Sequence, residues 1–236
     1  MTRRVFLFLA FDWLFFWRYR TIAGIRFRRI REGNSSNRYL LIHGNEETAR
    51  QVLTQHMKRH QGTAHLVTGP ERNVRIQGAL IDPNRLFSRV GAEVSLRRLN
   101  SDLSNARIND VLQFLDRERP KLIHALVPPA GGVLIATHNN SQGYSLTDEI
   151  PISDKIAVKQ PSQMHEFFLC THADDFEKIV KGPYNVVLQN SAPPDDDGSL
   201  SRLAGKMGVR YCNLETGLGK AEVQREMLEW LVKTIG

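Results

Sequence analysis

The sequence predicts a single α/β domain with a mostly parallel or mixed central sheet flanked by helices. Short apolar runs bounded by turn residues alternate with segments of helical periodicity, which is the pattern of strands and helices that follow one another along the chain. The length of 236 residues and the 41% hydrophobic content suit one sizeable core. No internal repeat and no hairpin signal is apparent, so an α/β arrangement is favoured over an all-β one.

The strand candidates are continuous apolar runs of strand length. In chain order they are 38–42, 63–69, 73–81, 121–127, 131–137, 166–171, 185–189 and 209–215. Helices are expected at 46–59, around 96–118 and at 219–235, because their apolar residues recur at three- and four-residue spacing. The stretch at 190–200 is rich in Pro, Asp, Ser and Gly and is expected to form a loop.

The net charge of +7 is concentrated at the N-terminus. Residues 1–31 contain eight arginines and a single acid, Asp12, so the remainder of the chain is neutral overall. A nucleic-acid binder would spread its basic residues over a folded face. The charge distribution therefore argues against nucleic acid as the partner.

Residues 1–31 form a segment distinct from the expected domain at 32–236. The run "VFLFLAFDWLFFW" (5–17) follows Arg3 and Arg4, as in a signal peptide or a membrane-surface anchor. A folded N-terminal helix is the alternative. Both a cell-envelope and a cytoplasmic location stay open, since Cys170 and Cys212 form neither a disulfide framework nor a CxxC pair and are expected to be buried free thiols.

Polar residues follow several of the apolar runs directly. His43 and Glu46 come after "YLLI", the turn "DPNR" (82–85) after "GALI", His138 after "VLIAT", and Glu215 ends "RYCNLE". Ligands of open α/β sheets bind at the carboxyl ends of the strands. Two histidines and a carboxylate are the ligand set of a catalytic zinc ion with one open position. Glu215 and Arg85 at the same edge offer a base and an anion clamp.

These motifs carry a resemblance to a known family. The order of "IHGNE", "DPNR", "HNN" and "LETG" resembles the zinc carboxypeptidase clan, and within it most closely the succinylglutamate desuccinylase/aspartoacylase group. The resemblance spans roughly residues 38–219. It implies a zinc-carboxypeptidase-like fold, one zinc ion held by His43, Glu46 and His138, a substrate carboxylate held by Asn84 and Arg85, and Glu215 as general base.

The residue types fit hydrolysis of an amide bond. Zinc lowers the pKa of bound water to about 7 and polarises a carbonyl, and a partly enclosed glutamate can move the proton to the leaving nitrogen. Arg85 presents a planar fork that suits bidentate carboxylate binding. The expected partner is a small molecule or a peptide with a free carboxylate.

The sequence departs from the family in two places. Relatives usually have an arginine upstream of the Asn-Arg pair that stabilises the oxyanion, and Arg75 is the best-placed candidate here, with Arg89 next. Relatives also have a β-rich domain that caps the site, whereas 21 residues follow Glu215. A more open pocket would favour a peptide substrate, and Tyr144 in "QGYS" is a candidate to reach into it.

Several alternatives remain at this stage. His43 and Glu46 alone would fit an ordinary strand-to-helix turn, with the carboxylate placed at the helix N-terminus. Other polar groups with metal-binding potential are the pair His56 and His60, and the cluster of His165 and His172 with nearby acids. An inactive binding protein of the same fold, or an adaptor that contacts a membrane surface through residues 1–31, would be a different class of function.

Overall fold

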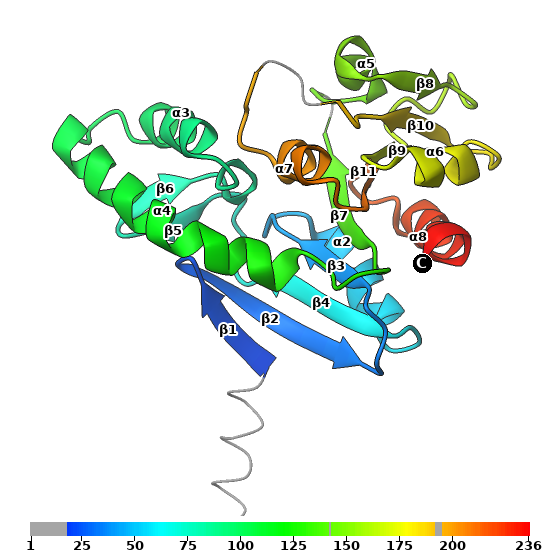
Figure 1. The fold of residues 1–236 in the computed structure, drawn as a ribbon, viewed down its shortest axis with the longest axis horizontal. Coiled ribbons are helices and arrows are strands. Elements are labelled where there is room, and N and C mark those ends of the chain that lie inside the picture. The colour runs from blue at the N-terminus through cyan, green and yellow to red at the C-terminus, as the bar shows by residue number, and fades with distance from the viewer. Residues whose placement is uncertain (1–17, 142, 192–194) are drawn as a thin grey trace, which may run out of the picture.

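The computed structural model describes residues 18–141, 143–191 and 195–236. Its centre is a nine-stranded mixed sheet with the strand order β1-β2-β4-β3-β7-β11-β9-β10-β8 (Figure 1). The strands of this sheet are β1 (Tyr19–Ile22), β2 (Ile25–Glu32), β3 (Arg38–Leu41), β4 (Gly62–Val67), β7 (Leu134–Asn140), β8 (Lys155–Ala157), β9 (Phe167–Cys170), β10 (Asn185–Leu188) and β11 (Tyr211–Gly217). A separate hairpin joins β5 (Val74–Ile76) and β6 (Ala79–Ile81).

Four central strands, β4, β3, β7 and β11, run parallel to one another. The pair β9 and β10 is parallel within itself and antiparallel to β11, and β1, β2 and β8 add antiparallel strands at the two edges. The predicted α/β class with a mixed sheet is therefore confirmed.

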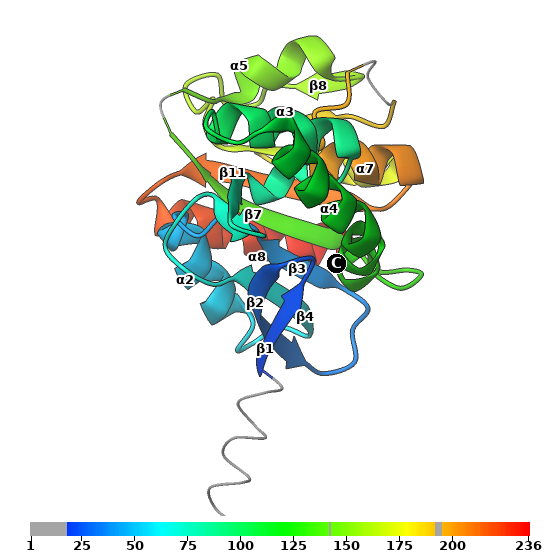
Figure 2. The ribbon, with the colours of Figure 1, turned by 90° about the vertical axis from the view of Figure 1, so that its left-hand side faces the viewer.

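Helices cover both faces of the sheet (Figures 1 and 2). The helices are α2 (Glu47–His56), α3 (Arg89–Leu99), α4 (Asn105–Leu126), α5 (Leu146–Glu149), α6 (Ala173–Ile179), α7 (Leu200–Met207) and α8 (Ala221–Ile235), with short 3-10 turns η1 (Pro83–Arg85) and η2 (Ile150–Ile152). Apolar side chains of α2, α6 and α8 pack on one face, and those of α3, α4 and α7 pack on the other. Each helix buries its apolar stripe against alternate residues of the strands, which makes one domain with two core layers.

The N-terminal part of the described chain belongs to the sheet. The expected boundary after residue 31 lies inside β2, because Ile25 and Phe27 are buried in the core and β2 pairs with β4 along its length. Ala23 and Gly24, both with positive φ, form the tight turn between β1 and β2, a hairpin that the sequence did not signal. The apolar run 5–17 lies outside the described residues.

The predicted strand at 121–127 is wrong. These residues continue α4 through Pro120, because Leu115, Leu122 and Leu126 recur at helical spacing and are all buried on one stripe. The helix expected around 96–118 is divided into α3 and α4, and Ser104 caps the start of the second helix by accepting a hydrogen bond from the Arg107 amide.

None of the helices in the described ranges has both the length and the apolar character needed to cross a membrane.

Candidate metal centre

The candidate site lies at the carboxyl ends of the parallel strands. His43 and Glu46 follow β3, while His138 lies near the end of β7 and Glu215 near the end of β11. The parallel register pairs Glu215 with His138, so the two side chains share one face of the sheet. The predicted meeting of these residues at one sheet edge is thus what the topology produces.

The turn after β3 has a steric reason for its glycine. A Cβ atom on Gly44 would come within 2.4 Å of the carbonyl oxygens of Gly69 and Glu71. The Gly44 amide also donates a hydrogen bond to the Glu71 carbonyl at 2.9 Å. This close approach fixes the segment 69–72 against the turn and brings Arg72 to the site.

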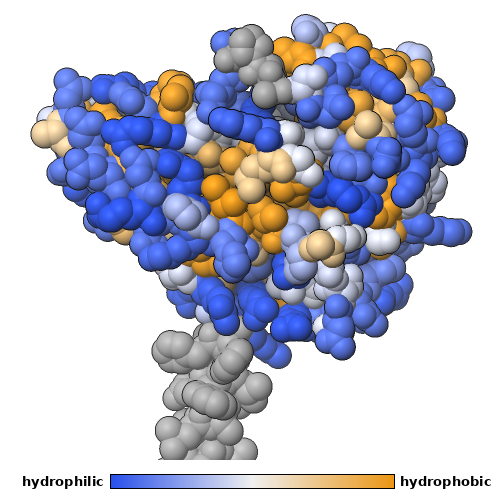
Figure 3. Space-filling view, viewed as in Figure 1, coloured by the Kyte–Doolittle hydropathy of each residue, from blue (hydrophilic) through white to orange (hydrophobic). Residues whose placement is uncertain are grey.

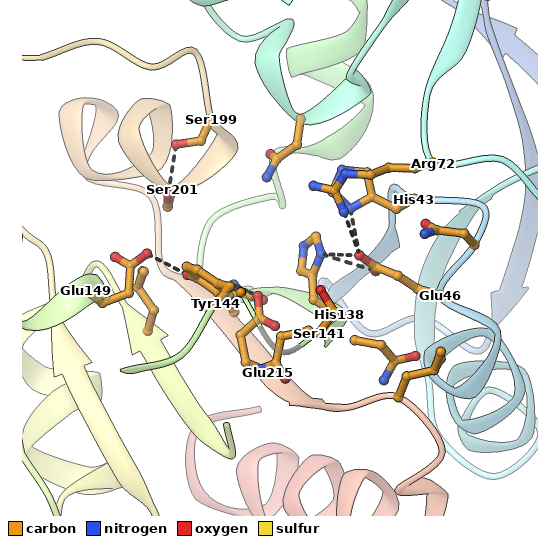
Figure 4. Close-up of a pocket in the computed structure, with 18 of the residues that line it drawn as sticks. His43, Glu46, Arg72, His138, Ser141, Tyr144, Glu149, Ser199, Ser201 and Glu215 are labelled. Carbon is orange, nitrogen blue, oxygen red and sulfur yellow. Dashed lines mark hydrogen bonds and ion pairs between the residues drawn. The ribbon is translucent and has the colours of Figure 1, made fainter. Parts of the chain in front are cut away.

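Three buried side chains form a group that could hold a metal ion and is called the metal-binding group below (Figure 4). One ligand atom each from His43, Glu46 and His138 lies within 4.8 Å of the others, and this is the one such group in the part of the chain that the structure describes. His43 Nδ1 lies 2.7 Å from Glu46 Oε1, and His138 Nδ1 lies 3.2 Å from Glu46 Oε2. The hydrogen bond of His138 Nδ1 is with Glu46 Oε1 at 3.3 Å, so Oε2 of Glu46 is buried without a hydrogen-bond partner of its own. Two imidazole nitrogens and a carboxylate oxygen with spare capacity fit the donor set of zinc.

Polar contacts outside this group hold the candidate ligands in place. His43 Nε2 lies 3.0 Å from Asp82 Oδ1, which orients the ring so that Nδ1 faces Glu46. Asn139, next to His138 in β7, accepts a hydrogen bond from the Ala49 amide at 2.8 Å and so ties β7 to the start of α2. The sequence placed Asp82 in the "DPNR" turn but did not predict its contact with His43.

The charged groups of the metal-binding group shift the pKa values of one another. Burial alone would raise the pKa of Glu46, but the adjacent His138 and His43 outweigh it and hold this pKa low. For His138, burial acts to lower the pKa, and the negative charges of Glu46 and Glu215 raise it overall. The centre therefore favours a positive charge between its carboxylates.

Glu215 has the environment of a general base. Burial and the charge of Glu46 raise the pKa of Glu215 to about 7, and His138 and a hydrogen bond from Asn213 Nδ2 at 3.0 Å act in the opposite direction. A carboxyl group with a pKa near neutrality can both accept and return a proton.

A cavity of about 500 Å³ opens beside the metal-binding group. Its lining includes Asn84, Arg85 and Tyr144, the three predicted substrate-binding residues. Each has a partner within the protein: Arg85 pairs with Asp197 at 2.5 Å, Asn84 Oδ1 accepts from the Leu200 amide at 3.1 Å, and the Tyr144 hydroxyl donates to Glu149 at 2.5 Å. Asp197 belongs to the loop expected at 190–200.

The arginine beside the metal-binding group is Arg72, which the sequence motifs did not predict. Its guanidinium lies 3.7 Å from Glu46 and 3.4 Å from Asp82, and it lines the cavity. The structure does not bring Arg75 or Arg89 to this cavity. Arg75 lies in the β5–β6 hairpin and donates to the Gly78 carbonyl, and Arg89 pairs with Asp116.

Neither of the other candidate clusters forms a group of three or more possible metal ligands in the described residues. The rings of His56 and His60 stack in parallel at 3.9 Å, and His165 Nδ1 lies 2.9 Å from the Tyr144 carbonyl. Cys170 and Cys212 are buried free thiols, as expected.

Three solved protein chains align with this chain, and two of them are described here. A protein from Shewanella baltica OS155, provisionally described as a metallopeptidase, aligns over 98% of this chain and 92% of its own, with 12% identity and a TM-score of 0.44. A protein from Shewanella amazonensis SB2B, described in the same way, aligns over 98% of this chain and 90% of its own, with 9% identity and a TM-score of 0.40. No protein-family model matches the chain, and no curated protein matches its sequence.

Proposed function

We propose that this protein is a zinc-dependent hydrolase that cleaves an amide bond near a free carboxylate, with a site organised as in the succinylglutamate desuccinylase/aspartoacylase group. One observation carries the proposal: His43, Glu46 and His138 converge in a buried group beside a large cavity, and Glu215 is paired with His138 in the sheet. An ordinary strand-to-helix turn would explain His43 and Glu46 but not the convergence of the other two.

The metal ligands of this proposal are His43, Glu46 and His138. Zinc bound there would act as a Lewis acid that polarises the scissile carbonyl and makes water more acidic. Asp82 holds the His43 ring in the orientation that presents Nδ1.

Glu215 is the proposed general base. It accepts the proton of the attacking water and returns it to the nitrogen of the leaving amine, so no covalent bond to the protein is formed. Arg72 is the proposed electrostatic stabiliser, because its fixed charge faces the metal-binding group from the edge of the cavity.

Arg85 and Asn84 are proposed to bind the carboxylate of the substrate. The guanidinium fork of Arg85 suits bidentate recognition, and its ion pair with the carboxylate of Asp197 supports this role. The cavity is large enough for an amino-acid side chain or a short acyl group. A peptide and an N-acyl amino acid are both substrates of this kind.

The first experiment measures zinc in the purified protein beside the variants His138→Ala and Glu215→Gln. We expect about one zinc per chain in the wild type and in Glu215→Gln, and little in His138→Ala, because that variant removes one of three ligands. Glu215→Gln is expected to lower kcat by a factor of about 10² to 10⁴, as for loss of a general base.

Two results would contradict the proposal. A Glu215→Gln variant with near-normal turnover on peptides or N-acyl amino acids would exclude Glu215 as the base. Wild-type protein that binds no zinc even after incubation with the metal would leave a binding protein of the same fold, without catalysis, as the better description.

A further inference from the structure

Four arginines gather on one face of the sheet near its β1 edge. Arg31 in β2 and Arg38 in β3 both pair with Thr63 of β4, and Arg29 pairs with His65 in the next row. Arg20 in β1 pairs with Phe27 of β2, which is two residues before Arg29 in that strand and so lies one row further along the same face. Residues paired across neighbouring strands point to the same face. Arg20, Arg29, Arg31 and Arg38 are called the arginine patch below.

The arginine patch has no acidic partner among the described residues. None of its members takes part in an ion pair of the described chain, in contrast to Arg50, Arg85 and Arg210 elsewhere. Arg38 donates only to main-chain carbonyls, those of Ser36 and Asn37. Burial and the positive charges of Arg20, Arg31 and Arg38 lower the pKa of Arg29. Like charges held together in this way favour an anion from outside the domain.

A buried polar group lies in the same patch. His65 pairs directly with Arg29, is only 4% exposed, and its Nδ1 has no hydrogen-bond partner. Nδ1 of an imidazole can donate to an anion or accept from a hydroxyl.

The patch is open to the outside. Arg20 and Arg31 are exposed, and Arg29 and Arg38 are half-buried. In Figure 1, α4 crosses the sheet above β1 and β2 and leaves the end of β2 clear of it. The surface over this part of the molecule, at the bottom of Figure 3, is mainly hydrophilic. An extended anionic surface can therefore reach several of the arginines together.

The sequence that precedes the patch indicates which kind of anionic surface the arginines bind. Residues 5–17 are apolar or aromatic except for Asp12, and they are followed directly by Arg18 and then by the arginines of the patch. Tyr19, two residues after this run, pairs with Arg28 in the sheet, next in the chain to Arg29 of the patch. Apolar and aromatic residues next to a cluster of arginines are typical of segments that lie at a membrane interface. A nucleic acid would use the arginines but would have no use for the apolar stretch.

We propose that the arginine patch docks this protein on the surface of a bilayer that contains anionic phospholipids. The guanidinium groups bind lipid phosphates. Arg38 begins β3, whereas His43 follows the other end of that strand. None of the four arginines of the patch lines the cavity beside the metal-binding group, so docking through the patch leaves this cavity accessible to substrate.

The experiment measures sedimentation of the full chain with vesicles. One set is phosphatidylcholine alone, and the other contains about 30% phosphatidylserine, a composition that attracts polybasic segments. The test variant carries Arg20→Gln, Arg29→Gln and Arg31→Gln, none of which removes a side-chain hydrogen bond of the described structure. The control variant carries Arg98→Gln, Lys178→Gln and Lys206→Gln, which removes the same charge from exposed positions without ion pairs. Circular dichroism establishes that both variants are folded.

We expect wild type and control to bind the anionic vesicles, and the test variant to bind them about 10²-fold more weakly, as expected for the loss of three arginines at the membrane surface. Raising the salt from about 0.05 M to about 0.5 M should weaken the wild type in the same way. Equal binding of test and control variants, or equal binding of wild type to both vesicle types, would overturn the proposal. A competition with a short DNA duplex gives a further test. The proposal would be overturned if the duplex displaces the wild type from the vesicles and the test variant binds both the duplex and the vesicles as tightly as the control does. Zinc content plays no part in this readout, so it is independent of the proposed catalytic function.

Discussion

The ion pair between Arg85 and Asp197 places an internal carboxylate where the proposed substrate carboxylate would bind. The two side chains are 33% and 45% exposed, so water weakens their attraction. A substrate that uses Arg85 must exchange with Asp197, and that exchange costs part of its binding energy. Asp197 is therefore expected to reduce the affinity for carboxylate substrates without taking part in the reaction.

The variant Asp197→Asn tests this expectation. Asparagine keeps an acceptor for the Ser199 amide, which Asp197 Oδ1 now binds at 2.9 Å, so the loop is preserved. KM for a substrate with a free carboxylate should fall by a factor of about two to five with little change in kcat, the range expected for an exposed ion pair. Steady-state kinetics with the substrate and with its amide, which lacks the charge, provide the measurement.

The exposed Asp195 is the matched control, because Asp195→Asn removes the same charge from the same loop. An equal fall of KM in this control would mean that the effect comes from the loss of a negative charge in the loop, and not from the loss of the ion pair with Arg85. An unchanged KM in Asp197→Asn would mean that Arg85 does not bind the substrate.

How far the site could be predicted depends on how each residue is placed. His43, Glu46, His138 and Glu215 follow or end apolar runs, and the strand-end rule brings such residues together without knowledge of the loops. Arg72 and Asp197 come from irregular segments, and their positions depend on contacts that no periodicity encodes. The glycine of "HGNE" was the available signal for Arg72, because its missing side chain admits the 69–72 segment.

At the scale of elements, the strands of the parallel centre were easier to predict than the helices. The strands are continuous apolar runs because both faces of the sheet are covered. The stretch 121–127 is also apolar, but its buried Leu122 and Leu126 are four residues apart and extend the stripe of α4. Pro120 concealed this continuity, since proline usually ends a helix.

The packing of α3 against the loop that carries Asp197 can be tested at Gly91. A Cβ atom there would lie 2.3 Å from Gly198 Cα and 2.5 Å from the Asp197 carbonyl oxygen. Alanine normally stabilises a helix by about 1 kcal/mol relative to glycine. Overpacking against main chain costs about 1–3 kcal/mol, so Gly91→Ala should have a net destabilising effect.

The measurement is the midpoint of thermal unfolding, Tm. We expect Gly91→Ala to lower Tm by a few degrees, at roughly 2–4 °C for each kcal/mol in a chain of this size. Val94→Ala on the same helix, where the side chain is 63% exposed, should leave Tm nearly unchanged. A higher Tm in Gly91→Ala would show that the loop is not packed on α3 in solution.

For the molecule as a whole, the alternation of strands and helices predicted the class, but it could not predict the order of strands. The sheet places β4 between β2 and β3, and β11 between β7 and β9. Long-range pairing of this kind depends on which apolar faces match in three dimensions. The packed fold also buries two histidines, His56 and His65, which are 6% and 4% exposed.

These two histidines make stability depend on pH. Burial, followed by the charge of His60, lowers the pKa of His56 to about 3, and burial, followed by Arg29, Arg38 and Arg20, lowers that of His65 to about 4. In the unfolded chain both have the ordinary value of about 6.5. Above pH 6.5 both states are neutral and the stabilisation is complete. As the pH falls below 6.5 the unfolded state binds protons that the folded state excludes, so stability is lost toward pH 4 to 3.

The test compares the fall of Tm between about pH 7 and pH 5 in wild type and in His56→Gln. In this pH range a histidine with a lowered pKa reduces the free energy of unfolding by up to about 1.4 kcal/mol for each pH unit. Glu215, with its raised pKa, changes stability in the opposite direction over this window, so the difference between the two proteins is the informative quantity. The variant should lose less Tm than the wild type on acidification, because it has one buried histidine fewer to protonate on unfolding. His124→Gln, which removes an exposed histidine of α4, should follow the wild type. If His56→Gln and wild type lose the same Tm, His56 titrates normally in the folded protein and the packing of α2 against β3 is looser than the structure has it.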